Sequence, residues 1–317
     1  ILHLANSDYF FVTPRGSGSG MTGGSLPVEG GIVLAMGRLN RILEIDKDNL
    51  IARAEPGVVT GHFHRSVESE GLFYPPDPSS SDFSTLGGNL AECAGGPRAV
   101  KYGVTRDYVL GLEAVLPTGE IIHSGVKTAK GVVGYDLTRL LIGSEGTLGI
   151  ITEATLRLLP LPPERRTLLA AFDAVEAAAA AVAKTFRAGV LPCAIEFMDG
   201  AAIRCVEQYE PAGLPADAAA ILVVEVDGSA HAGRERSDAR RDRGLRRMGF
   251  TVLRLDVLVH GSCAQVAASV DSRVIRVSDD RVQTQPGPVR QKILQDDERA
   301  RVRCRPPRSG QPHGVDL

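Results

Sequence analysis

Residues 15–24, RGSGSGMTGG, are the part of this sequence whose composition points most directly to ligand chemistry. Small side chains and freely rotating glycines let consecutive backbone amides converge on an anion, so such a stretch is suited to form a nest for a diphosphate. The segment also contains the spacing GxGxxG, which is found at the pyrophosphate turn of nicotinamide-binding proteins. A mobile Gly-Ser linker is the alternative interpretation of the same composition.

The residues after the glycines argue against a nicotinamide-binding turn. In that motif the third glycine begins a helix, and an acidic residue about 20 positions later binds the ribose. Here Pro27 and the pair Gly30-Gly31 prevent a helix of useful length, so this interpretation ranks last. The phosphate-loop alternative fails because no GK[ST] follows. A strand, FFVTP, that delivers a diphosphate nest is what remains.

Two later stretches reduce the weight of the linker interpretation. Residues 74–111 and 126–162 combine Pro, Gly, Ser and Asn in the way that rigid loops in close contact with a ligand require. The strings PRGSGSGMTGG, GLFYPPDPSS, TLGGNLAECAGGPRAVKYGVT and KTAKGVVGYDLTRLLIGSEGTLGIITEATLRLLPLP resemble the FAD-linked oxidoreductases of the vanillyl-alcohol oxidase (PCMH-type) family. Within that family, the similarity is greatest to the FAD-binding subunits of glycolate oxidases and to D-lactate dehydrogenases. It runs from residue 12 to about residue 228.

The resemblance implies FAD as the cofactor, held mostly by small or backbone-presenting residues. The pyrophosphate would lie on Gly16, Ser17, Gly18, Ser19, Gly20 and Met21. The isoalloxazine and ribityl side would be lined by Pro76, Asp77, Thr85, Gly88, Asn89, Gly95 and Gly96. The cofactor would continue along Tyr102, Gly103 and Val109, and its adenine would lie near Glu145, Gly149 and Ile150.

The resemblance also implies a reaction. A D-2-hydroxy acid of the glycolate or D-lactate class would be oxidised by hydride transfer to flavin N5, while a base accepts the hydroxyl proton. The HxxGDGNxH-like stretch that supplies metal ligands and a histidine in the family is not found here, so the catalytic residues stay unassigned and no metal site is expected. The alternative is a non-catalytic flavin-binding subunit, or an inactive fragment, of a glycolate oxidase complex.

Composition narrows the choice of partners. The 36 Lys and Arg nearly balance the 38 Asp and Glu, which argues against nucleic acid, and no apolar run reaches the length of a membrane span. The five cysteines are odd in number and lack CxxC pairing, so a reducing cytoplasm is expected. An electron-acceptor subunit with iron-sulfur clusters is implied by the resemblance alone, because no cysteine cluster here would hold one.

The elements that must position these residues indicate an α+β protein. Short strands are expected over 9–14, 31–36, 41–46, 50–57 and 149–160, with a hairpin around Pro117-Thr-Gly119. Helices are expected over 60–70, from Thr85 onward and over 136–141. After residue 163, strands alternate with helices, and one helix has Asp173 as its expected N-cap and Gly189 as its stop.

The Pro-rich stretch LPLPPERR predicts a domain boundary. We expect a PCMH-type FAD-binding domain of two α+β subdomains over 1–162, with its N-terminal part missing, followed by part of a ferredoxin-like cap over 163–258. Residues 259–317 lack a sustained period and are expected to be disordered or non-native, as from an altered reading frame. A basic nucleic-acid-binding tail is the alternative for this last segment.

Three side chains have a second, chemical interpretation. Cys93 is expected to be a small buried thiol rather than a reactive one. His62 and His64 suggest covalent flavin attachment or metal binding, but residues at i and i+2 of a helix point apart. We therefore expect both histidines to be solvated helix residues.

Overall fold

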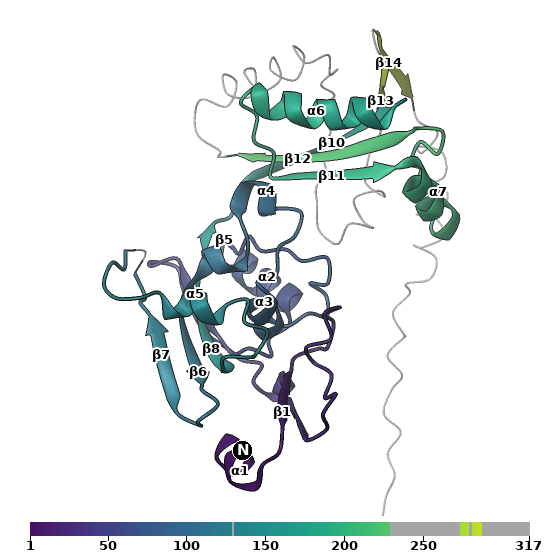
Figure 1. Cartoon of the computed structure of the whole chain (residues 1–317). Coiled ribbons are helices and arrows are strands. Elements are labelled where there is room, and N and C mark those ends of the chain that lie inside the picture. Colours follow the sequence, from purple (N-terminus) through teal and green to yellow (C-terminus); the bar gives the residue numbers. More distant parts are fainter. Residues whose placement is uncertain (129, 229–272, 279–280, 287–317) are drawn as a thin grey trace, which may run out of the picture. The chain divides into compact units, whose positions relative to one another are not determined.

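The computed structural model describes residues 1–128, 130–228, 273–278 and 281–286, and Figure 1 labels their helices and strands. The chain divides into two compact units. The first contains residues 1–165 and 191–196 and the end of a strand that reaches residue 228; the second contains residues 166–190 and 197–223 with the last two strands. The fold is α+β, as predicted.

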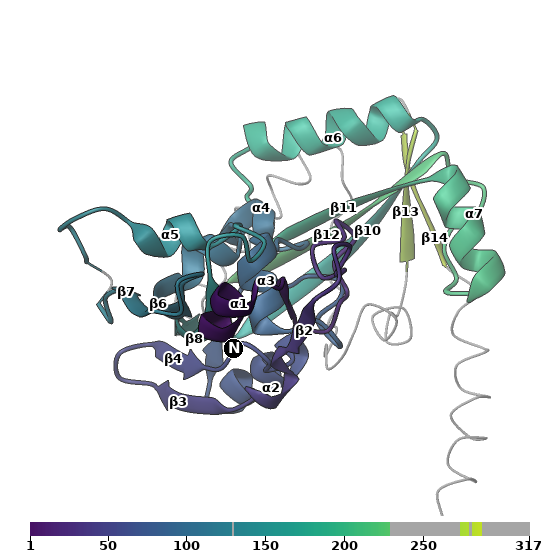
Figure 2. The ribbon, with the colours of Figure 1, turned by 60° about the horizontal axis from the view of Figure 1, so that its bottom comes forward.

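A five-stranded sheet with the order β3-β4-β8-β6-β7 forms the centre of the first unit. All four neighbouring pairs are antiparallel, so β8 lies between two hairpins (Figure 2). The strands are β3 (Ile42–Asp46), β4 (Ile51–Ala54), β6 (Val109–Val115), β7 (Ile121–Gly125) and β8 (Ile150–Arg157). The hairpin predicted around Pro117-Thr-Gly119 is confirmed, because Val115 pairs with Ile121.

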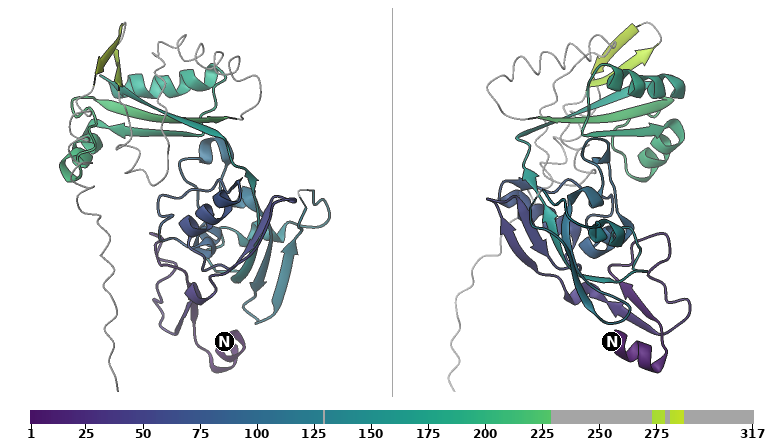
Figure 3. Two further views of the ribbon diagram at one scale, coloured as in Figure 1. Left: turned by 180° about the vertical axis from the view of Figure 1, so that it is seen from behind. Right: turned by 60° about the vertical axis from the view of Figure 1, so that its left-hand side comes forward.

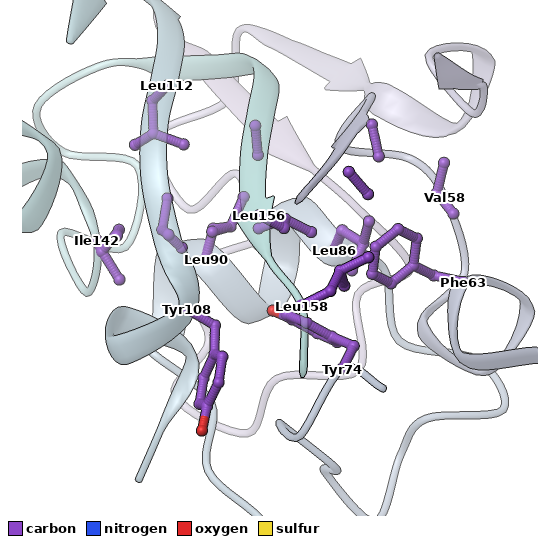
Figure 4. Close-up of a cluster of buried hydrophobic side chains, with 14 of the residues drawn as sticks. Val58, Phe63, Tyr74, Leu86, Leu90, Tyr108, Leu112, Ile142, Leu156 and Leu158 are labelled. Atoms are coloured by element: carbon purple, nitrogen blue, oxygen red, sulfur yellow. The ribbon is translucent and has the colours of Figure 1, made fainter. Parts of the chain in front are cut away.

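The core of the first unit lies on one face of this sheet. Ala154, Leu156 and Leu158 alternate along the chain and are each 1% exposed or less, so they form the buried face of this segment. Their neighbours include Phe63, Leu90, Tyr74 and Tyr108 (Figure 4). Burial of these large side chains is the main force that fixes the helices against the sheet.

Two of the predicted helices begin at residues whose side chains cap them. Thr85 accepts a hydrogen bond from the Gly88 amide at 3.3 Å, and Asp136 accepts one from the Arg139 amide at 2.9 Å. The helices are α1 (Leu2–Asp8), α2 (Thr60–Ser69), α3 (Leu86–Glu92), α4 (Ala99–Tyr102) and α5 (Leu137–Leu141), with 3-10 turns η1 (Met36–Arg38) and η2 (Thr105–Tyr108). Two small sheets complete the unit, pairing β1 (Val12–Arg15) with β2 (Ile32–Ala35) and β5 (Leu72–Phe73) with β9 (Leu159–Pro160). None of the helices in the described residues has the length and apolar character needed to cross a bilayer.

The second five-stranded sheet has the order β11-β12-β10-β13-β14. Its strands are β10 (Glu164–Phe172), β11 (Ala194–Asp199), β12 (Ala220–Gly228), β13 (Arg273–Ser278) and β14 (Arg281–Pro286). Helix α6 (Val175–Arg187) runs beside these strands in both views of Figure 3. Helix α7 (Gly200–Tyr209) packs on the sheet through Ile203, which shares a buried cluster with Ala171 and Ile221.

Two predictions for this part of the chain are wrong. Asp173 does not cap α6: the N-cap is Ala174, which makes no side-chain hydrogen bond, because the helix begins one residue later than expected. Strands β13 and β14 lie within the segment predicted to be disordered, where β13 pairs in parallel with β10. The alternation of strands and helices expected after residue 163 also predicts a helix over 232–248 and a strand over 250–256, and both lie outside the described residues.

The ion pair between Arg41 and Glu55 predicts an acid-sensitive step in stability. Glu55 is 5% exposed and accepts the Arg41 amide at 2.8 Å and the guanidinium at 2.8 and 3.1 Å. Hydrogen bonds from the Arg41 side chain, above all, lower the pKa of Glu55. Its stabilisation is therefore present above the unfolded pKa of about 4.3 and is lost as the pH falls below that value.

Glu55→Gln is expected to unfold at lower urea concentration than wild type at pH 7, and the difference should shrink toward pH 3.5. Urea midpoints across this pH range measure it. Glu29→Gln, at an exposed position, is the control and should follow the wild-type curve. A Glu55→Gln difference that does not change with pH would contradict the assignment.

Candidate functional site

The glycine loop that follows β1 packs against the first turn of α3. A β-carbon added at Gly16 would lie 2.4 Å from the Thr85 Oγ1 atom, so the loop backbone touches the cap of the helix. Gly18 has φ +72°, a left-handed conformation that glycine adopts without strain. The Ser17 and Ser19 hydroxyls lie 3.2 Å apart, which draws the two sides of the loop together.

The backbone amides of this loop are available to a ligand. Within the described part of the chain, no protein group accepts a hydrogen bond from the amides of residues 16–21. The Arg15 guanidinium lies beside Gly18, where an added β-carbon would be 2.8 Å from its Nε. Free amides next to a cation suit a diphosphate. Sequence reasoning missed Arg15, although its position directly before the glycines was a usable signal.

Three segments distant in the sequence meet around the loop. The Glu92 carboxylate accepts the Thr22 hydroxyl at 3.2 Å and faces Gly20, so the negative charge lies at the far half of the loop from Arg15. An added β-carbon at Gly146 would lie 3.2 Å from Pro14, and the Glu145 amide donates to the Ala91 carbonyl at 3.0 Å. Residues 14–24, helix α3 and residues 143–146 therefore form one continuous wall.

Gly16→Ala is expected to weaken FAD binding about tenfold by pushing the loop away from α3. Since Gly16 does not need a left-handed backbone, the effect is steric and comes from the Thr85 hydroxyl. Gly16→Ala/Thr85→Ala should recover part of the affinity, although Thr85→Ala alone costs about 1 kcal/mol of capping. Flavin fluorescence titration measures all three variants, and an unchanged affinity in Gly16→Ala would exclude the loop from the site.

The second predicted stretch forms a bend around Asp77. A β-carbon at Gly96, whose φ is +149°, would lie 2.0 Å from the Asp77 carbonyl oxygen, so the two backbones are in direct contact. The Arg98 Nε atom lies 3.4 Å from the Asp77 carboxylate. Arg98 also stacks 5.2 Å from the centre of the Phe73 ring. Pro76, Asp77 and Gly96 are thus brought together.

Some predicted residues serve the protein scaffold. Asn89 is 4% exposed, and its side-chain amide donates to the Thr60 hydroxyl at 2.7 Å, so its side chain is used within the core. Val109 is also part of the core. Met21, by contrast, is fully exposed. For Asn89 and Val109 the backbone remains as the candidate for cofactor contact, as it does for Gly88 in the first helical turn and for Gly95, which faces Val104.

Tyr102 has its hydroxyl fixed by a buried carboxylate. It donates to Asp227 at 2.6 Å, and Asp227, whose side chain is 2% exposed, also pairs with Lys101. Burial, followed by the bond to Asp227, raises the pKa of the Tyr102 hydroxyl, which therefore stays a protonated donor. Gly103, with φ +82°, lies against the Asp107 carboxylate, which accepts the Val104 amide at 2.9 Å.

A cavity of about 320 Å³ lies next to the residues predicted for the adenine end. Ile150 lines it together with Leu34, Met36 and Thr152, and Gly149 approaches the Val115 carbonyl at its edge. A mostly apolar cavity of this size is in the range of small-ligand sites. Glu145, the third predicted residue at this end, is exposed and does not line the cavity.

The prediction that both histidines of α2 are solvated is wrong for one of them. His62 is exposed, but His64 is half-buried and its Nε2 atom lies 2.8 Å from the Pro76 carbonyl oxygen. Its contact partner, Pro76, lies in the loop after β5, so the periodicity of the helix alone could not predict the contact. Cys93 is a half-buried free thiol that ends α3 with φ +52°. The described residues contain no group of His, Cys, Asp and Glu able to hold a metal ion.

Comparison with known protein families shows to which family the chain belongs. The model of an FAD binding domain matches residues 1–125, and the model of the C-terminal domain of FAD linked oxidases matches residues 161–252. The chain belongs to the FAD-linked oxidases. In this family the cofactor is FAD, and the free amides of residues 16–21 and the closeness of Gly16 to Thr85 fit an extended diphosphate. The second match continues past residue 228, where the resemblance was expected to stop.

Individual FAD-linked oxidases show what share of a relative's length this chain covers. The glycolate oxidase subunit GlcD of Bacillus subtilis (strain 168) is 52% identical over 228 residues, which cover 72% of this chain and 48% of that protein. The D-lactate dehydrogenase of Anaerostipes hadrus is 42% identical over 209 residues, 66% of this chain and 44% of that protein. The chain thus spans just under half the length of these curated relatives.

A solved structure supports the fold. An alkyldihydroxyacetonephosphate synthase superposes with a TM-score of 0.67 at 25% sequence identity, over 78% of this chain and 50% of that chain. This likeness and the two family matches agree with the expected PCMH-type domain followed by part of a cap.

Proposed function

We propose that this chain binds FAD along residues 16–21, 76–103 and 145–150 and takes part in the oxidation of a D-2-hydroxy acid of the glycolate or D-lactate class. The glycine loop carries the proposal: its amides have no protein acceptor in the described residues, it touches the cap of α3, and Arg15 lies beside it. The substrate class follows from relatives named glycolate oxidase subunit and D-lactate dehydrogenase.

The chain's own residues would bind and orient the cofactor. FAD supplies the hydride acceptor for oxidation of the hydroxyl-bearing carbon. The loop amides would donate hydrogen bonds to the diphosphate, and the Arg15 guanidinium would add a charge-assisted interaction. The backbone at Pro76, Asp77 and Gly96 would form a rigid wall beside the ring system, and the mostly apolar cavity at Ile150 would contact the adenine.

An electron-acceptor subunit belongs to the same proposal. The word subunit in the name of the Bacillus subtilis relative supports a multi-subunit assembly. We also propose that this acceptor carries iron-sulfur clusters and that the chain is cytoplasmic. Co-purification of a brown partner with an iron-sulfur absorption spectrum would support the former.

Anaerobic titration with 2-hydroxy acids tests the function. The purified chain is expected to be yellow, and its flavin band near 450 nm, about where free flavins absorb, should bleach with D-lactate or glycolate and not with the L-isomer of lactate. A yellow protein that no hydroxy acid bleaches would indicate the non-catalytic flavin-binding subunit instead. A chain that binds no FAD would overturn the proposal.

A further inference from the structure

His64 stands out because it is half-buried without belonging to the hydrophobic core. It lies on α2, whose inner face is made by Phe63 and Val67, each 0% exposed. Its Nε2 atom is 2.8 Å from the Pro76 carbonyl oxygen. Since a carbonyl oxygen only accepts hydrogen bonds, Nε2 carries the proton, and this contact selects one tautomer of the ring.

The main chain of the segment that His64 contacts makes few hydrogen bonds. Pro75 and Pro76 have no amide hydrogen, and within the described chain no backbone hydrogen bond involves residues 74–77. Tyr74, Pro75 and Pro76 are buried, and the Tyr74 ring packs edge-on against Phe63, so packing holds this part of the segment. The restraints on Asp77 are the ion pair with Arg98 at 3.4 Å and the close approach of Gly96 to its carbonyl. Among described residues, His64 is thus the one donor to the main chain of this segment.

The charge environment keeps this donor uncharged near neutral pH. Burial lowers the pKa of His64, and this effect outweighs the nearby Asp77 carboxylate, which acts in the opposite direction. The other charged groups that act on the ring are Arg98, which lowers the pKa further, and Glu68, which raises it. A neutral imidazole donates to Pro76 without placing a second cation beside Arg98.

We propose that His64 is a positioning residue for the flavin: its Nε2–H group fixes the Pro76 carbonyl and so holds the Pro76–Asp77 backbone in the conformation that meets the ring system. The inference rests on the proposed function, which assigns this segment to the isoalloxazine side. His64 touches neither cofactor nor substrate in this role. Its contribution passes through the loop.

Two substitutions of similar length separate the hydrogen bond from the packing. In His64→Gln the side-chain amide nitrogen takes the place of Nε2, whereas His64→Met fills similar space without a donor. FAD is titrated by fluorescence under conditions in which urea unfolding shows each variant to be fully folded. The affinity is expected to be about tenfold weaker for His64→Met and within about twofold of wild type for His64→Gln. The bound-flavin absorption band should shift only in His64→Met.

The outcomes separate the inference from the proposed function. If wild type binds FAD and His64→Met binds it with the same affinity and spectrum, the positioning role is wrong and the proposed function stands. If His64→Gln loses as much affinity as His64→Met, the ring itself rather than its donor is required, which also overturns the inference. If wild type binds no FAD, the proposed function fails, and the inference with it.

Discussion

Gly96→Ala is expected to cause a large loss of flavin binding. The new β-carbon would lie 2.0 Å from the Asp77 carbonyl oxygen and 2.4 Å from its carbonyl carbon, and both atoms are backbone. No rotamer change relieves that contact, and φ +149° is itself strained for alanine. We expect a loss of about 3 kcal/mol in unfolding free energy and about a hundredfold in FAD affinity.

Gly37→Ala is the matched control for this substitution. An added β-carbon at Gly37 meets no atom within 4 Å, and its backbone is not left-handed. Urea unfolding and FAD titration should therefore place Gly37→Ala within about 0.5 kcal/mol of wild type. Equal behaviour of the two variants would mean that the Asp77 bend yields to the added methyl group and that the bend is not a rigid wall.

Lys101→Met is expected to cause the largest loss of stability among the charged residues. Asp227 is 2% exposed at its side chain, and without Lys101 it would keep only the Tyr102 hydroxyl as a described side-chain partner. Removing one member of a buried ion pair leaves an uncompensated charge and costs about 3–5 kcal/mol. The urea midpoint measures this loss.

A second substitution separates the charge from the packing. Lys101→Met/Asp227→Asn removes both charges and should recover most of the lost stability, because the amide still accepts the Tyr102 hydroxyl. Lys47→Met breaks the ion pair with Glu70, whose side chains are 56% and 41% exposed, and should cost less than about 1 kcal/mol. A Lys101→Met loss no larger than that of Lys47→Met would contradict the buried-pair assignment.

Elements defined by neighbouring residues were predictable from the sequence. Thr85 and Asp136 start helices because their side chains cap the amides three residues later, and Pro117-Thr-Gly119 closes a hairpin between adjacent strands. The glycine spacing was informative for the same reason, since backbone freedom at Gly18 is a local property. These signals act within a few residues, where the sequence is directly readable.

Features that depend on distant partners were not predictable in this way. Lys101 and Asp227 are 126 residues apart in the chain, and the residues around each of them do not predict the ion pair. His64 looked like a surface residue because its contact with Pro76 depends on how a loop folds over α2. Strand β13 lacked a clear period of its own and pairs with β10 over a long separation in sequence.

The central position of β8 has a consequence for the order in which the protein matures. During synthesis the β3–β4 and β6–β7 hairpins emerge first, each with an unpaired edge, and only β8 joins them. Residues 143–146, which close the wall around the glycine loop, immediately precede β8. The first unit is therefore expected to bind FAD late, after residue 157 has emerged from the ribosome. It is not expected to bind FAD when only the glycine loop has been synthesised.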